Sequence, residues 1–180
     1  ALRSYASEEA LIRYRLRVEI AWLRWLATEP AVPEPRPFSA NAEAALERIA
    51  AEFGETDARR VKEIERTTNH DVKAVEYFIK QRLGQHAPWR SRLEFVHFAC
   101  TSEDINNTSH ALQLRAGRDV VLLPALDRVL LKLREMARTY ADMPMLSRTH
   151  GQTASPTTVG KEIANVVVRL QAACDRIAAV

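Results

Sequence analysis

The side chains best suited to chemistry fall into three short polar clusters, each with a histidine within it or just before it. They are Asn69-His70-Asp71, Thr101-Ser102-Glu103-Asp104 after His97, and Thr149-His150-Gly151-Gln152. Histidine exchanges protons near neutral pH, and two clusters stand just before predicted helices, where unpaired N–H groups and the helix dipole attract anions. The clusters therefore predict a site for an anionic ligand. Plain helix capping by the same residues is the alternative.

Other kinds of chemistry have little support in the sequence. Cys100 and Cys174 belong to no C-x-x-C pair, so neither a disulfide framework nor a zinc site is expected. No H-E-x-x-H motif occurs, and none of the five glycines forms a Rossmann or P-loop phosphate turn. Because no base accompanies Cys100, a small buried role is favoured over a nucleophilic one. We therefore expect neither a metal nor a cofactor.

Charge and hydropathy exclude two classes of partner. The 26 basic and 23 acidic side chains are interleaved, so the net charge of +3 forms no stripe for nucleic acid. The longest uncharged apolar run, residues 120–126, is far shorter than the roughly 20 residues that span a membrane, and no signal segment opens the chain. We expect a soluble, cytoplasmic protein without nucleic-acid or membrane partners.

The elements that must position the clusters are helices, because apolar residues recur at helical spacing in nearly every segment. The fold class predicted is all-α. A segment with Pro30, Pro33, Pro35 and Pro37, residues 29–38, is predicted to be a rigid extended connector. The shorter helices are predicted at residues 7–28, 39–53, 57–66, 71–83 and 88–100.

Two longer helices follow, at residues 102–140 and 156–180. Ser102 is the expected cap of the first, and a break is possible at Gly117 or Pro124. Both helices repeat apolar residues at alternating steps of three and four, which predicts that they are neighbours in a bundle. The polar segment between them could form a short hairpin about Gly151. With no C-cap before Val180 and no initial methionine, we expect a chain cut at both ends.

Three strings of this sequence resemble the adenylosuccinate lyase family, in its bacterial purine-biosynthesis form within the fumarase/aspartase superfamily. They are IERTTNHDVKAVEYF at residues 64–78, FACTSEDINN at 98–107 and LSRTHGQ at 146–152. The resemblance extends over essentially all 180 residues and keeps the family's order. It implies a helical N-terminal domain at residues 1–99 and the start of the central long-helix bundle at residues 100–180.

The resemblance also implies an activity, a cofactor-free β-elimination. Fumarate would leave adenylosuccinate, giving AMP, and would likewise leave the succinyl form of the aminoimidazole carboxamide ribotide. His150 matches the family's general acid, which protonates the leaving nitrogen. The positions matching substrate-binding residues are Asn69, His70, Asp71, His97, Thr101, Ser102 and Thr149.

Some family features are missing from these 180 residues. The family's catalytic base is a serine in a flexible loop with a Met-Pro-x-Lys signature, which this sequence lacks. The resemblance therefore implies a fragment of a homotetramer subunit, inactive alone, whose active sites are shared among subunits. Another superfamily lyase, argininosuccinate lyase first, is one alternative. A non-catalytic helical interaction module is the other.

Overall fold

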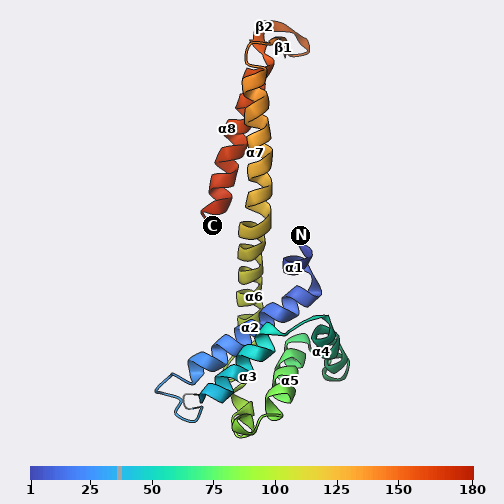
Figure 1. Cartoon of the computed structure of the whole chain (residues 1–180). Coiled ribbons are helices and arrows are strands. Elements are labelled where there is room, and N and C mark those ends of the chain that lie inside the picture. The colour runs from blue at the N-terminus through green and yellow to red at the C-terminus, as the bar shows by residue number, and fades with distance from the viewer. Residues whose placement is uncertain (36–37) are drawn as a thin grey trace. The chain divides into compact units, whose positions relative to one another are not determined.

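A computed structural model of the chain describes residues 1–35 and 38–180. The chain forms two compact units, Ala1–Arg115 and Ala116–Val180 (Figure 1). The all-α fold class is confirmed, since within the described residues the only sheet is one two-stranded hairpin. No helix in the described part of the chain has the length and apolar character needed to cross a membrane. The domain boundary expected after residue 99 stays a prediction.

The first unit is built from helices that follow the predicted apolar pattern closely. Ser7 and Ser39, the first residues of two of the predicted helices, cap α2 and α3 by accepting hydrogen bonds from the backbone N–H of Ala10 and Ala42. The elements are α1 (Arg3–Ala6), α2 (Glu8–Leu26), α3 (Ala40–Ala51), α4 (Glu55–Thr68), α5 (Asp71–Gly84), the 3-10 turns η1 (Ala87–Trp89) and η2 (Leu93–Phe95), and α6 (Ser102–Gly117).

The core of this unit lies among α2, α3, α4 and α5. Leu16 and Leu23 of α2 are fully buried, as are Val75 and Ile79 of α5, and the indole of Trp89 closes the same cluster. Burial of large apolar side chains on both helices supplies most of the driving force for this packing. The N-terminus of α5, which carries His70 and Asp71, is thereby fixed against α2.

Two predictions about helices in this unit are wrong. Residues 88–100 form no α-helix, because Trp89 and Val96 are both drawn into the core and the backbone then turns through positive φ at His97 and Ala99. The helix expected from Asp57 begins earlier. Its N-cap is Gly54, whose N–H donates to the Asp57 carboxylate at 3.2 Å, so Asp57 caps from inside the first turn.

The proline-rich connector is non-helical, as expected, but is folded into turns in its described part. The carbonyl of Glu29 accepts from the N–H of Val32, and the Glu29 carboxylate accepts from that of Ala31. These local bonds replace the predicted extended chain with a turn. Pro37, part of the same prediction, lies outside the described residues.

The second unit is a helix pair with a hairpin at one end (Figure 1). α7 and α8 lie side by side, and Leu130, Val167 and Cys174 are buried between them, so the predicted pairing of these helices is confirmed. The elements are the π-helical segment η3 (Arg118–Leu122), α7 (Leu123–Thr139), β1 (Pro144–Thr149), β2 (Gln152–Thr158) and α8 (Val159–Ala178).

The chain stays helical through Gly117 and Pro124, where the sequence allowed a break. Gly117 has helical φ and ψ, and the N–H of Leu123 donates to the carbonyl of Arg118, five residues back. Pro124 has no N–H, and its ring would collide with the carbonyl four residues earlier. One wider turn accommodates the ring, so the chain stays helical.

α8 begins at Val159 instead of residue 156. Pro156 lies in β2, and Thr158 caps the helix by accepting from the N–H of Lys161 at 3.1 Å. Directly after the cap, Gly160 meets the end of α7. A Cβ at this position would lie 2.4 Å from the carbonyl oxygen of Ala137. Only glycine therefore allows the two helix ends to approach this closely.

Candidate functional site

The link between α4 and α5 places His70 at a helix N-terminus. Asn69 ends α4 with a φ of 53°, a left-handed conformation that asparagine tolerates. The chain then reverses, and His70 Nδ1 accepts a hydrogen bond of 3.3 Å from the N–H of Lys73. In the neutral ring the hydrogen therefore resides on Nε2, which points away from its own helix.

The N-terminus of α6 is capped by Thr101 and not, as predicted, by Ser102. Thr101 Oγ1 accepts from the N–H of Asp104, and the Asp104 carboxylate accepts from the Thr101 N–H at 2.7 Å, a reciprocal capping box. The Thr101 N–H and hydroxyl hold the pKa of Asp104 below its ordinary value. With Thr101 as the cap, the Ser102 hydroxyl is released for other partners.

That hydroxyl contacts His70. Ser102 Oγ lies 3.2 Å from His70 Nε2, so the N-termini of α5 and α6 meet. When the ring donates its Nε2 hydrogen to Ser102, the serine O–H remains available to donate to a ligand. Two helix N-termini and a serine donor at one place suit a carboxylate or a phosphate.

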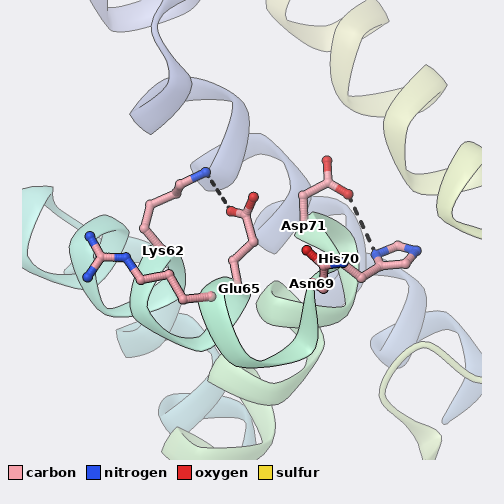
Figure 2. Close-up of a pocket in the computed structure, with 6 residues that line it drawn as sticks. Lys62, Glu65, Asn69, His70 and Asp71 are labelled. Carbon is pink, nitrogen blue, oxygen red and sulfur yellow. Dashed lines mark ion pairs between the residues drawn. The ribbon is translucent and has the colours of Figure 1, made fainter.

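An open hollow of about 600 Å³ lies beside His70 (Figure 2). Its wall combines both signs of charge. The lining residues are Lys62, Glu65, Arg66, Asn69, His70 and Asp71. The Lys62 ammonium pairs with Glu65 at 2.6 Å and with Glu8 at 2.7 Å, and these hydrogen bonds raise the pKa of Lys62. The structure therefore brings the predicted cluster of residues 69–71 to one hollow.

Asp71 has a partner that the sequence analysis missed. Its Oδ2 lies 2.6 Å from Nη2 of Arg15, which is almost fully buried on α2. Burial opposes ionisation of Asp71, but the N–H of Val72 and the Arg15 guanidinium outweigh it and lower the pKa of the carboxyl. The sequence did contain a signal for this contact, because Arg15 is a charged residue on the buried face of α2, next to Leu16.

His97 contacts the same helix. Its Nδ1 lies 2.6 Å from Oε1 of Glu19, whose side chain is fully buried. The hydrogen bond to Glu19 raises the pKa of His97, against the opposing effect of burial. One turn further along α2, Trp22 Nε1 donates to the carbonyl of Phe98 at 2.8 Å. α2 thus fixes the loop that leads to Thr101.

Cys100 lies in this loop and is poorly suited to be a nucleophile. Burial raises the pKa of its thiol to about 11, and the carboxylates of Glu19 and Asp104 act in the same direction. The reactive thiolate is therefore scarce near neutral pH. Among the described residues no group of His, Cys, Asp and Glu side chains is arranged to bind a metal ion.

Thr149 and His150 belong to the second unit, where the hairpin about Gly151 is confirmed. Thr149 pairs with Gln152 at the end of the strands, and His150 and Gly151 both have positive φ, at 51° and 77°. Two consecutive positive φ values characterise the tight turn that suits a two-residue hairpin. His150 is exposed at its tip, and the extended strands position it.

Comparison with known proteins gives the family and the fold. The lyase family model matches residues 1–180. Adenylosuccinate lyase of Vibrio cholerae is 55% identical, over 99% of this chain and 39% of its own length. Adenylosuccinate lyase of Escherichia coli K12 is 51% identical, over 95% and 38%. The chain thus spans less than two fifths of the curated relatives it matches.

Solved structures share the fold at lower identity. The 3-carboxy-cis,cis-muconate lactonizing enzyme of Pseudomonas putida has a TM-score of 0.76 at 24% identity, over 98% of this chain and 38% of that one. A fumarate lyase of Mesorhizobium sp. BNC1 has the same TM-score at 21% identity. These likenesses support the helical fold alone.

Proposed function

The chain belongs to the lyase family of the fumarase/aspartase superfamily, and from this premise we propose that the protein containing it is an adenylosuccinate lyase of purine biosynthesis. The observation that carries the proposal is identity of 51–55% with curated adenylosuccinate lyases over 94–99% of the chain. At that coverage the clusters at His70, Ser102 and His150 lie within the shared region.

The proposed reaction is a β-elimination. A base removes a proton from the β-carbon of the succinyl group, the electron pair forms the double bond of fumarate, and the C–N bond breaks. The departing nitrogen takes a proton, and AMP or the aminoimidazole carboxamide ribotide is released. His150, exposed at the hairpin tip, is proposed to donate that proton. The base is proposed to come from outside these 180 residues.

The paired N-termini of α5 and α6 are proposed to bind an anionic group of the substrate. Ser102 would donate its hydroxyl hydrogen to a carboxylate or phosphate oxygen, with Thr101 and Asn69 beside it. Thr149 is proposed to bind substrate beside His150 on the hairpin. His97 and Asp71 are already engaged by Glu19 and Arg15, so we propose that they support the site through those contacts.

Assembly into a cytoplasmic homotetramer with shared active sites is part of the same proposal. The second unit presents large apolar side chains that nothing in that unit covers, among them Leu131, Val166 and Val168, each more than half exposed. Such side chains on a helix pair favour association with further helices. In this proposal residues 1–99 form the N-terminal domain and residues 100–180 begin the bundle. Sedimentation of the complete protein tests the tetramer.

The activity is tested with the protein encoded by the complete reading frame. Incubation with adenylosuccinate should release fumarate and AMP in equal amounts, and argininosuccinate should release none. Fumarate from argininosuccinate alone would overturn the proposal in favour of the alternative lyase. Release of fumarate from neither substrate would favour the remaining alternative, the non-catalytic helical interaction module. The 180-residue chain alone should be inactive, since it lacks the proposed base loop.

A further inference from the structure

Arg15 has an unusual position for an arginine. It lies on α2 between apolar core residues and is only 7% exposed. Its guanidinium donates from two different nitrogens to two different helices. Nη2 contacts Asp71 Oδ2 of α5 at 2.6 Å, and Nε contacts Asn106 Oδ1 of α6 at 2.9 Å. A buried charge is tolerated only when it is paired in this way.

Both partners of Arg15 stand next to the candidate site. Asp71 directly follows His70, and Asn106 follows Ser102 by four residues, which places it one turn along the same face of α6. The guanidinium therefore joins the same two helices that the contact between His70 and Ser102 joins. Its planar fork sets the spacing of the helices, which the point charge of a lysine could not do for both partners.

We propose that Arg15 is a positioning residue that holds the N-termini of α5 and α6 in register, so that His70 can donate to Ser102 and Ser102 can donate to the bound anion. The role of the anion site rests on the proposed function, whereas the effect on the helix register does not. Arg15 contacts neither the hollow beside His70 nor Ser102 itself. Its influence passes through Asp71 and Asn106.

The test uses the complete protein with Arg15→Lys and Asn106→Ala. The second variant removes only the contact to α6 and leaves the Arg15–Asp71 pair intact. Asn107→Ala is the matched control, because Asn107 is the exposed neighbour on the same helix. We expect each test variant to raise KM for adenylosuccinate roughly tenfold with kcat little changed, and the control to match the parent. Adding Asn106→Ala to Ser102→Ala should raise KM no further than Ser102→Ala does alone, because Asn106 acts through Ser102.

A merely structural role predicts a different pattern. Fewer folded molecules would lower the apparent kcat and leave KM unchanged, and that result would overturn the inference. A crystal structure of the Asn106→Ala variant provides a second test, which does not depend on enzymatic activity. The distance from His70 Nε2 to Ser102 Oγ should exceed hydrogen-bond range, and a retained 3.2 Å would also overturn the inference. If the parent protein lacks lyase activity, the proposed function fails, and this distance alone decides the role of Arg15.

Discussion

His70 Nε2 and Ser102 Oγ lie 3.2 Å apart, although 32 residues separate them in the chain. Each is at the N-terminus of a helix whose capping is already provided. His70 itself caps α5 through Nδ1, and Thr101 caps α6. Neither cap uses His70 Nε2 or the Ser102 hydroxyl, so these two groups are available to contact each other. The sequence clusters that capping alone could explain therefore also lie in contact, as the proposed anion-binding surface requires.

Replacing His150 tests its proposed role as the general acid. In the complete protein His150→Asn should lower kcat by about 10²–10⁴-fold, the usual contribution of a positioned general acid. Asparagine is the informative replacement because it tolerates the positive φ of 51° at the hairpin tip. Steady-state kinetics at saturating adenylosuccinate provides the measurement.

Stability serves as the control for this variant. Because His150 is exposed and makes no packing contact in the core clusters, the thermal midpoint of His150→Asn should stay close to that of the parent. Near-normal kcat across the neutral pH range would contradict the role of His150 as the acid.

Much of the fold was predictable from local signals. Ser7 and Ser39 precede apolar periodic segments, and both cap helices where expected. The glycine after His150 marked the hairpin, because a tight turn needs positive φ. Residues 88–100 were predicted incorrectly because burial of Trp89, a long-range effect, overrides local helix preference there.

The candidate site was predictable in its residues but not in its contacts. The clusters at His70 and Ser102 stand out by type, yet their meeting depends on how α5 and α6 pack against α2. Thr101 and Ser102 are both good caps, and only the reciprocal bond with Asp104 distinguishes them. Arg15 and Glu19 were overlooked because buried charges on a helix are recognised only once their partners are known.

The close approach of α7 and α8 makes a prediction about Gly160. A Cβ there would lie 2.4 Å from the Ala137 carbonyl oxygen and 2.6 Å from the backbone of Ala141. Gly160→Ala should therefore lower the free energy of unfolding by about 1–3 kcal/mol, as overpacking does elsewhere. Thermal or denaturant unfolding measures this change.

Gly84→Ala is the matched control. A Cβ at Gly84 would meet only the Leu93 side chain, at an ordinary 3.6 Å, and α5 should gain from the better helix former. Equal stability changes at Gly160 and Gly84 would show that the approach of α7 to α8 is looser than described.

The pair of His97 and Glu19 makes stability depend on pH. The hydrogen bond to Glu19 raises the pKa of His97 above its ordinary 6.5, with burial opposing it, Glu76 adding to the rise and Lys73 opposing it. The pair therefore stabilises the folded state fully below the unfolded pKa, and this contribution is lost as pH rises through the folded pKa.

We expect the difference in unfolding free energy between the parent and His97→Asn to be larger near about pH 6 than near about pH 9. Asparagine keeps the positive φ accessible at this position. Denaturant unfolding at both pH values gives the comparison, with His110→Asn on the exposed surface of α6 as the control. A larger difference at the higher pH would reverse the sign and rule out the pairing.

The binding role of the paired helix N-termini is tested most directly by Ser102→Ala in the complete protein. Loss of one hydrogen bond to a charged substrate group should raise KM for adenylosuccinate by roughly 10- to 150-fold. Thr108→Ala is the control, because the Thr108 hydroxyl on the same helix donates only to the Asp104 carbonyl. We predict a raised KM for Ser102→Ala alone, with the thermal midpoint unchanged. An unaltered KM and kcat in Ser102→Ala would contradict the account of this site.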